Sequence, residues 1–279
     1  MKKIIWKLWR TFAARPAFRK VNQLMFDCSL RGLGILNHEN YKVSGEEHFV
    51  KKVLPLYANK ESVLFVDVGA NCGNYINLLK ELHPNASLVA FEPNPKTYKI
   101  LEKRFTDSNV ITINKGLGNK ESALKFYDRK DYDGSSSHGS LYRKVIEEFH
   151  KTEVVEMEVD IMTFDAYALQ NSICNVTLLK IDTEGHELEV LKGAQKFLKN
   201  EGVDLLQIEF NEMNLISRVF FRDISQLLTN YIPYRLLPSG AIKLGKSPLK
   251  TELFAFQNIV FVNKKFKPDK AMKPTVRTS

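Results

Sequence analysis

A turn that combines glycines with short polar side chains stands out among the residues that could do chemistry. It begins at the end of the apolar run 63–68 and carries, at alternate positions, Asp67, Gly69, Asn71 and Gly73. Glycines let the backbone turn tightly and come close to a ligand, while the carboxylate and the amide can bind polar or cationic groups. A dinucleotide diphosphate prefers the bare backbone of a G-x-G-x-x-G turn. The pattern therefore favours a nucleotide-like ligand with a cationic amino-acid end.

A glutamate at the end of the next apolar run completes this predicted pocket. Residues 87–91 are followed by Glu92 and Pro93. A carboxylate at this place can accept hydrogen bonds from both hydroxyls of a ribose. Because the carboxyl ends of parallel strands meet at one edge of a sheet, we expect Glu92 to face the ligand that the glycine turn binds.

A dense ionisable cluster follows a third apolar run. Residues 176–181 have the pattern of a strand buried on both faces, and after them come Asp182, Glu184, His186 and Glu187. The cluster ends a strand and opens a helix, so it should lie at the same sheet edge as the glycine turn. Side chains at a helix start also cap and stabilise the helix, so we expect one or two of these four to be structural.

The elements that must position these residues follow an alternation of apolar strands and helices. Strands are predicted at residues 62–68, 87–91, 109–114, 176–181, 203–210 and 254–262. Helices are predicted at residues 73–83, 95–106, 186–199 and 219–230. Continuous apolar strands favour parallel pairing, whereas residues 234–237 and 254–262 favour an antiparallel pair that closes the sheet. The sequence therefore predicts an α/β fold with a mostly parallel sheet and one reversed strand near its edge.

The alternation breaks between residues 120 and 165. Short strands are predicted at residues 123–127 and 154–159, on either side of the glycine- and serine-rich segment 133–140. Long loops in compact domains are commonly functional lids or disordered segments. We interpret this one as a loop on the substrate side, with disorder as the alternative, and His138 as a residue that could reach an acceptor.

The positive charge of the chain is concentrated at its two ends. The 279 residues include 41 Lys and Arg against 32 Asp and Glu, a net charge of +9, yet residues 1–20 contribute +7 and residues 264–279 contribute +5. The body between them is slightly acidic, which argues against a basic nucleic-acid groove across the fold. Cysteines 28, 72 and 174 have neither disulfide nor metal spacing, so we expect a reducing, cytoplasmic compartment.

The N-terminal end has the pattern of an amphipathic helix, because apolar residues recur at helical spacing among basic ones. Charges interrupt the apolar stretch too often for a signal peptide, and the stretch is too short to span a bilayer. Residues 2–20 could contact the inner face of a membrane peripherally. They could instead pack on the domain or on a second subunit, which we favour because amphipathic helices usually face protein. The predicted division is a basic amphipathic extension at residues 1–40, a main domain at 41–262 and a basic disordered tail at 263–279.

Taken together, these motifs resemble the FkbM family of S-adenosylmethionine (SAM)-dependent methyltransferases. The resemblance is carried by the segments 65–73, 91–93, 179–187, 190–194 and 207–209, and also by 44–46 and 159–165. It covers roughly residues 40–262 in register and leaves out both charged ends. His186 departs from the family pattern, which often has a small residue there, so the resemblance implies no role for it.

The resemblance implies a Rossmann-like class I methyltransferase fold with a seven-stranded sheet. It also implies SAM as the cofactor and transfer of a methyl group to an oxygen, commonly a hydroxyl of a sugar or of another small molecule. The methionine end of SAM would be held by Asp67, Gly69, Asn71 and Gly73, and its ribose by Glu92. Asn94 would flank the ribose or the adenine, and the adenine would lie near residues 114–118.

An acceptor hydroxyl is a weak nucleophile, so the reaction needs a base that removes its proton. Asp182 is our first candidate, because it is the first residue past its strand and would face the methyl group of SAM. His186 is the second, since histidine has the better-matched pKa, and Glu209 is the third candidate or an orienting residue. A magnesium-assisted reaction at Asp182, Glu184 and Glu209 is a weaker alternative, so no metal is predicted.

Other function classes fit the sequence less well. A nucleic-acid methyltransferase is disfavoured by the acidic body and by the absence of an Asn-Pro-Pro-Tyr type segment after residues 176–181. An NAD-dependent oxidoreductase is disfavoured because the glycine turn lacks the dinucleotide spacing. A non-catalytic cofactor-binding protein is disfavoured by the ionisable cluster at the pocket. We therefore expect an O-methyltransferase that acts on a small-molecule or glycan acceptor and not on nucleic acid.

Overall fold

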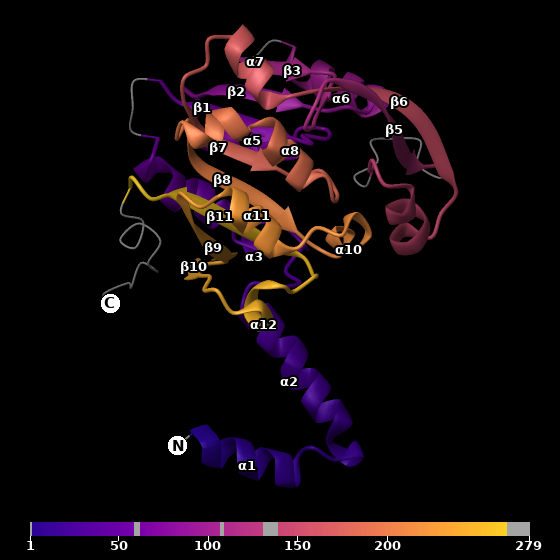
Figure 1. The fold of residues 1–279 in the computed structure, drawn as a ribbon, viewed down its shortest axis with the longest axis vertical. Coiled ribbons are helices and arrows are strands. Elements are labelled where there is room, and N and C mark those ends of the chain that lie inside the picture. The colour runs from indigo at the N-terminus through magenta and orange to yellow at the C-terminus, as the bar shows by residue number, and fades with distance from the viewer. Residues whose placement is uncertain (1, 59–61, 107–108, 131–138, 267–279) are drawn as a thin grey trace.

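The computed structural model brings the strands predicted outside residues 120–165 into one central sheet. It describes residues 2–58, 62–106, 109–130 and 139–266. Eight strands pair in the order β10-β9-β11-β8-β7-β1-β2-β3. Figure 1 shows this sheet running through the middle of the domain, with helices packed along it.

Five parallel strands form the half of the sheet that carries the site. They are β1 (Leu64–Val68), β2 (Ser87–Phe91), β3 (Val110–Ile113), β7 (Val176–Ile181) and β8 (Val203–Phe210). Residues of β1, β7 and β8 are buried along almost the whole of each strand, as expected where helices cover both faces. The predicted α/β fold with a mostly parallel sheet is confirmed.

The far edge of the sheet differs from the prediction in one respect. β11 (Gln257–Asn263) runs antiparallel between β8 and β9 (Tyr231–Leu237), which confirms the expected antiparallel closure. β10 (Gly240–Lys243) then pairs antiparallel with β9, so the sheet has eight strands instead of seven and two reversed strands instead of one. β10 has only 4 residues and is mostly half-buried, so its apolar pattern is too weak to reveal a strand.

A second sheet of three strands stands beside the site. β4 (Gly116–Leu117), β6 (Val154–Met162) and β5 (Ser122–Arg129) pair in that order, with β5 and β6 antiparallel. The two short strands predicted in this region are confirmed, and both are longer than expected. Figure 1 shows β6 as a long curved arrow at the side of the domain. The predicted substrate-side loop, including His138, falls mainly on residues 131–138, which lie outside the described part of the chain.

Helices cover both faces of the central sheet and form two apolar cores with it. One face packs against α7 (Phe164–Gln170), α8 (Glu187–Gly193), α9 (Gln195–Lys199) and α11 (Phe221–Leu227). The other face packs against α5 (Asn74–Leu82), α6 (Pro95–Phe105) and the helical turns η2 (Phe49–Val53) and η3 (Leu54–Leu56). Two short helices, α10 (Met213–Ser217) and α12 (Pro248–Thr251), complete the connections at the reversed edge.

A break at Ala194 divides the single helix that was predicted over residues 186–199 into α8 and α9. The carboxylate of Asp165, in α7, accepts hydrogen bonds from the backbone N–H groups of Lys196 at 3.0 Å and Phe197 at 2.9 Å. These bonds cap the start of α9. Because the cap comes from another helix, the local sequence pattern does not show the break.

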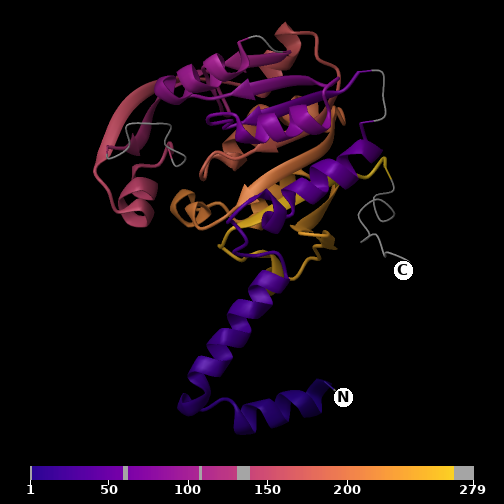
Figure 2. The same cartoon turned by 180° about the vertical axis from the view of Figure 1, so that it is seen from behind.

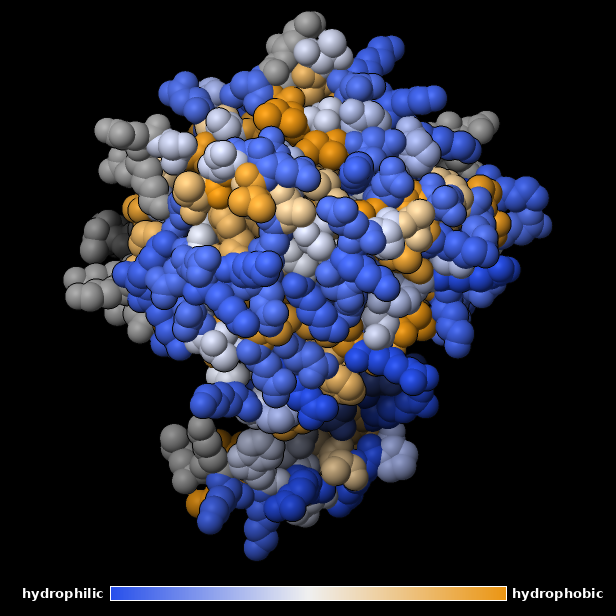
Figure 3. All heavy atoms as spheres, turned by 45° about the horizontal axis from the view of Figure 1, so that its top comes forward, coloured by the Kyte–Doolittle hydropathy of each residue, from blue (hydrophilic) through white to orange (hydrophobic). Residues whose placement is uncertain are grey.

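The N-terminal segment forms an arm that extends away from the sheet. It consists of α1 (Lys2–Phe12), the turn η1 (Pro16–Phe18) and α2 (Arg19–Gly32), and it joins the domain through α3 (Tyr41–Ser44) and α4 (Glu46–His48). Figures 1 and 2 show α1 at the end of α2 that is remote from the domain, and Figure 3 shows a narrow extension below a domain surface of mixed polarity. The packing of residues 2–20 on the domain, one of the two arrangements that we favoured, is therefore wrong: the apolar side chains of α1 are exposed. No helix in the described residues is both long and apolar enough to cross a membrane.

Candidate active site

The glycine turn connects β1 to α5 at the carboxyl edge of the sheet. The side chain of Asp67, near the end of β1, is fully buried. The N–H groups of Gly69 and Ala70 both donate to the carbonyl oxygen of Phe91, at 3.0 and 2.9 Å. These two bonds tie the turn to the end of β2 and form one fixed rim of a cavity.

Packing within the protein explains why two positions of this turn need glycine. Gly69 has a φ of +82°, and a Cβ atom there would collide with the carbonyl oxygen of Asp182. Gly73 has a φ of +81°, and a Cβ atom there would collide with the ring of Phe105. Both positions are thus restricted to glycine by backbone conformation and by close neighbours. Gly69 lines the cavity, whereas Gly73 does not line it and is the residue just before α5.

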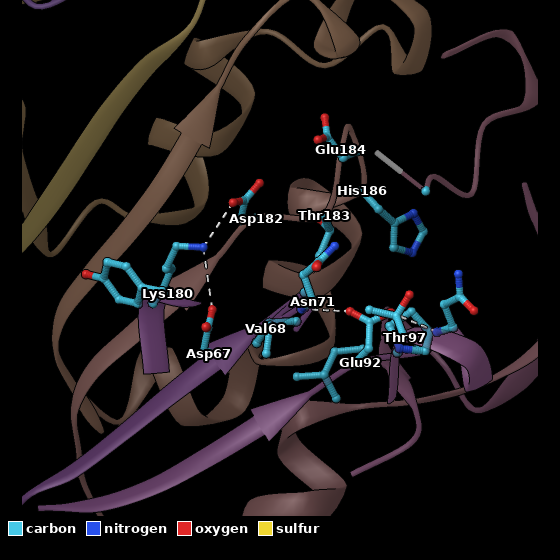
Figure 4. Close-up of a pocket in the computed structure, with 18 of the residues that line it drawn as sticks. Asp67, Val68, Asn71, Glu92, Thr97, Lys180, Asp182, Thr183, Glu184 and His186 are labelled. Atoms are coloured by element: carbon cyan, nitrogen blue, oxygen red, sulfur yellow. Dashed lines mark hydrogen bonds and ion pairs between the residues drawn. The ribbon is translucent and has the colours of Figure 1, made fainter. Parts of the chain in front are cut away.

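Glu92 presents a buried carboxylate to the same cavity. Its Oε2 accepts a hydrogen bond from the N–H of Asn71 at 2.8 Å, and its Oε1 accepts one from the N–H of Asn94 at 2.9 Å. Figure 4 shows Glu92 directed toward Asn71. Burial raises the pKa of Glu92 to about 7, although the two backbone donors oppose the rise. Each carboxylate oxygen has a further lone pair, so Glu92 can still accept hydrogen bonds from a ligand.

The side chain of Asn94 connects the elements that form the cavity next to Glu92. Its Oδ1 caps α6 by accepting the N–H of Lys96 at 3.0 Å, and its Nδ2 donates to the buried carboxylate of Asp128 at 2.7 Å. The second bond connects α6 to β5. Asn94 lines the cavity together with Gly116 and Leu117 of β4, the segment at which adenine is predicted to lie.

A buried lysine joins β1 to the loop after β7. Lys180 is paired with Asp67 in the register of the two strands, and its ammonium lies 3.5 Å from Asp67 and 3.0 Å from Asp182 (Figure 4). It also lies 5.0 Å from the centre of the Tyr75 ring. Burial alone lowers the pKa of Lys180, but neighbouring carboxylates, Asp182 foremost, raise it well above its ordinary value. Lys180 is therefore a fixed cation between carboxylates.

A network of buried hydrogen bonds lies around Lys180 and its carboxylate partners. The buried carboxylate of Glu46 accepts hydrogen bonds from Ser44 Oγ at 2.7 Å and from Gln207 Nε2 at 2.9 Å. Gln207 Oε1 in turn accepts one from the hydroxyl of Tyr75 at 2.6 Å. Burial raises the pKa of Glu46, and the charge of Lys180 opposes the rise. The network fixes α4, α5 and β8 around Lys180.

Glu187 shapes the loop between β7 and α8. Its Oε1 accepts hydrogen bonds from the N–H groups of Thr183 at 3.0 Å and Gly185 at 3.1 Å. Its Oε2 accepts one from Asn214 Nδ2 at 3.0 Å. Glu184 and Gly185 both have positive φ, of 51° and 104°, so the loop bends sharply around this carboxylate. Glu187 is thus a structural member of the cluster, as expected for one or two of its residues.

His186 lies on the side of the cavity near Glu92 and away from Lys180, as Figure 4 shows. Its side chain is only 9% exposed, and burial lowers its pKa to about 4. Its Nδ1 has no hydrogen-bond partner among the described residues. The ring is therefore neutral at physiological pH and is a weak base.

Glu209, near the end of β8, does not line this cavity but a second one beside it. Its Oε1 accepts a hydrogen bond from Asn211 Nδ2 at 2.8 Å. Burial, together with the negative charges of Asp182 and Glu184, raises the pKa of Glu209 well above its ordinary value. Glu209 is therefore a carboxyl group whose protonated form is favoured by its surroundings.

The two cavities meet at the end of β7. The first, of about 230 Å³, is bounded by the glycine turn, Glu92 and His186. The second, of about 640 Å³, is bounded by the segments 36–46 and 209–213, which include the end of β8, and by the rings of Phe149 and Phe256. The residues that line both are Tyr41, Lys180, Asp182 and Glu184. Among the described residues no three His, Cys, Asp or Glu side chains are placed to hold a metal ion.

This arrangement can hold one molecule in each cavity and present both to Asp182. The side chain of Asp182 is 27% exposed, so a ligand can contact it. Three residues of the site were not predicted as site residues from the sequence: Lys180, Glu46 and Asp128. Lys180 gave one signal, a lone charge within an apolar strand. Glu46 stands in the segment 44–46 of the family resemblance, whereas Asp128 gave no signal, and only the folded chain brings both residues to the site.

Comparison with known proteins identifies the family. Residues 67–232 match the model of the methyltransferase FkbM domain. Methyltransferase 1 of Beauveria bassiana is 27% identical over 179 residues, which are 58% of this chain and 68% of that protein. The hexuronic acid methyltransferase AglP of Haloferax volcanii is 27% identical over 167 residues, which are 59% of this chain and 62% of that protein. The crystal structure of methyltransferase FkbM from Methylobacillus flagellatus aligns with a TM-score of 0.43 and 16% identity, over 77% of this chain and 49% of that one.

The family match contains the first cavity's main polar residues. It begins at Asp67 and ends in β9, so it includes the glycine turn, Glu92 and the loop after β7. This chain spans about half the length of the solved protein and less than two thirds of the haloarchaeal relative. The family match covers more than half of the chain, and it agrees with the parallel sheet and with the position of the site at its carboxyl edge. The protein belongs to the FkbM family of SAM-dependent methyltransferases.

Proposed function

We propose that the protein transfers a methyl group from SAM to a hydroxyl oxygen of a sugar or a similar small polyhydroxylated molecule. The observation that carries the proposal is the position of Asp182 in the wall between two cavities. A cofactor in the first cavity and an acceptor in the second would both reach this carboxylate. Holding two reactants in contact replaces a bimolecular encounter by a unimolecular step.

The first cavity has the polar groups that SAM needs. Glu92 would accept hydrogen bonds from the ribose hydroxyls, and Asn94 would flank the ribose or the adenine near β4. The methionine end would lie at Asp67, Gly69 and Asn71. Asp67 Oδ2 is buried and has no hydrogen-bond partner among the described residues, so it is suited to a cationic amino group. Bound SAM supplies an electrophilic methyl group on a positively charged sulfur.

Asp182 is the base that the geometry favours for removing the proton of the acceptor hydroxyl. Lys180 holds its carboxylate at 3.0 Å and fixes its direction at the junction of the cavities. His186 is a weak base on the opposite side, and Glu209 does not line the first cavity. A positioned base contributes about 10²–10⁴-fold to such a reaction.

The lining of the second cavity supports a polyhydroxylated acceptor. Asn40, Asn211 and Glu212 offer hydrogen-bond partners for hydroxyl groups, while Phe149 and Phe256 offer apolar faces. The relative from Haloferax volcanii is named a hexuronic acid methyltransferase, which agrees with a sugar as the acceptor class. We also propose that the reaction takes place in the cytoplasm, where free cysteines are stable, since Cys28, Cys72 and Cys174 are all unpaired.

The substitution Asp182→Asn tests the proposal. Asparagine has nearly the same shape and can still accept a hydrogen bond from Lys180, but it cannot take up the hydroxyl proton. Methyl transfer to a panel of sugars and nucleotide sugars, measured as release of S-adenosylhomocysteine (SAH), should fall about 10²–10⁴-fold. The dissociation constant for SAH, measured by calorimetry, should stay within about twofold, because the predicted cofactor contacts are retained.

A matched control removes a carboxylate of the same kind from the surface. Glu81, on α5, is exposed and accepts a hydrogen bond from Asn77 of the same helix at 2.6 Å. Glu81→Gln should leave both turnover and SAH binding unchanged. Full turnover in Asp182→Asn would remove Asp182 from the role of base, and transfer to amines in place of hydroxyls would contradict the proposed acceptor class.

A further inference from the structure

The arm carries apolar side chains that no other described part of the chain covers. Six large apolar residues of α1 are each about half exposed or more: Ile4, Ile5, Trp6, Leu8, Trp9 and Phe12. Exposed apolar area on this scale, gathered on one short helix, marks a surface that binds a partner. The question is what chemistry that partner has.

The apolar and basic side chains of α1 lie on opposite sides of the helix. At 100° per residue, Ile4, Leu8 and Phe12 follow one another along one side, with Ile5 and Trp9 beside them. Lys3, Lys7 and Arg10 have the spacing i, i+4, i+7, which places them together on the other side. The helix is therefore amphipathic, and every charged side chain on it is basic.

The connection to α2 holds α1 in a defined direction. The side chain of Asn22, in α2, donates a hydrogen bond to the carbonyl oxygen of Ala13 at 2.8 Å, which fixes the corner between the two helices. α2 has 14 residues and so spans about 21 Å. Figures 1 and 2 show that it separates α1 from the domain and leaves the whole length of α1 accessible.

We propose that α1 binds the surface of an anionic lipid bilayer and lies in its interfacial plane. Charge complementarity decides between the possible partners: residues 1–20 contain seven basic residues and no acidic residue. A second copy of α1 would bring like charges together, whereas anionic headgroups attract each Lys or Arg near the surface. The helix has 11 residues, about 16 Å, which is far short of the roughly 30 Å hydrocarbon core. It can bury its apolar side in the acyl boundary while its basic side faces the headgroups.

The two tryptophans of the chain allow this binding to be measured by fluorescence. Trp6 and Trp9 are the only tryptophans in the sequence, and both are on α1. Adding vesicles of equal parts phosphatidylglycerol and phosphatidylcholine to the full chain should shift the tryptophan emission to shorter wavelength. Vesicles of phosphatidylcholine alone should give little shift, and added salt should weaken binding to the anionic vesicles.

Substitutions on the two sides of α1 separate the apolar contribution to membrane binding from the electrostatic one. Leu8→Glu should weaken binding to the anionic vesicles at least about tenfold, because it removes a buried apolar side chain. Lys7→Glu should weaken it at least about fivefold, because it reverses a charge at the headgroups. Leu249→Glu, at a site that is 85% exposed on α12, is the matched control and should bind like the parent protein.

Two results would overturn the proposal. One is equal binding of the parent protein and Leu8→Glu to anionic vesicles. The other is sedimentation as a dimer that Leu8→Glu dissociates, without any vesicle binding, which would make a second copy of this chain the partner. SAH binding by all variants should be unchanged, so failure of the membrane proposal is distinguishable from failure of the proposed methyl transfer.

Discussion

The carboxylate of Glu92 should make cofactor affinity depend on pH near neutrality. Burial raises its pKa to about 7 in the free protein. A ligand that donates two ribose hydroxyls needs the ionised form, since the protonated form presents a donor of its own. Affinity should therefore be full above pH 7 and should be lost progressively as the pH falls through 7.

The size of this effect follows from the pKa. With a pKa of about 7, the ionised fraction of Glu92 falls from about nine tenths at pH 8 to about one tenth at pH 6. The dissociation constant for SAH should therefore increase about tenfold between these two values. Binding should also release a proton from Glu92, close to one per SAH at about pH 6 and close to none at about pH 8.

Isothermal titration calorimetry measures both quantities, because titrations in buffers of different ionisation enthalpy give the number of protons released. Glu92→Gln should bind SAH weakly and without this pH dependence. Glu102→Gln, at an exposed position on α6, is the control and should keep the full dependence. An affinity that is flat between pH 6 and pH 8, with no proton released, would refute the assignment of Glu92 to the ribose.

Two further predictions concern stability and can be checked by urea unfolding. Lys180→Met should cost about 3–5 kcal/mol, because it leaves buried carboxylates without their cation, whereas Lys192→Met, in an exposed ion pair, should cost less than about 1 kcal/mol. Gly193→Ala should cost about 1–3 kcal/mol, because its Cβ would collide with the carbonyl oxygen of Gly118, whereas Gly245→Ala has open space and should change stability by less than about 0.5 kcal/mol. Equal costs within either pair would contradict the packing described.

The strands of the parallel half and their parallel pairing could be predicted because these strands are largely apolar. Residues 176–181 are such a run, and β7 is fully buried between β1 and β8. β10 was missed because a short edge strand buries too little to require apolar residues. The break between α8 and α9 was missed because Asp165, which caps α9, belongs to a different helix.

For the candidate site, too, local sequence pattern predicts some features, and others depend on contacts between residues far apart in the sequence. Asp67, Glu92 and Asp182 could be proposed from the sequence because each stands at or near the end of an apolar run. The residues that contact them in the folded protein, and so define their chemistry, could not be proposed from the sequence. Asp67 and Asp182 share Lys180 only because β1 and β7 are neighbours in the sheet, and the carbonyl group of Asp182 explains Gly69 only in the folded chain.

The arm shows where an amphipathic pattern is ambiguous. The spacing of Leu8 and Phe12 predicts a helix with one apolar side, and α1 is such a helix. The same spacing suits a helix that packs on its own domain, on another subunit or on a membrane. Only the exposure of these side chains in the folded protein excludes the first of the three.

The central claim is that the methyl group of SAM is transferred to a hydroxyl oxygen with Asp182 as the base. The most direct test supplies SAM labelled with ¹³C in its methyl group together with the panel of sugars and nucleotide sugars, and it locates the label in the product by NMR. The product should carry a ¹³C-methyl group bonded to oxygen, and Asp182→Asn should form it about 10²–10⁴-fold more slowly than the parent protein. A label bonded to nitrogen or carbon, or an equal rate in the variant, would contradict the claim.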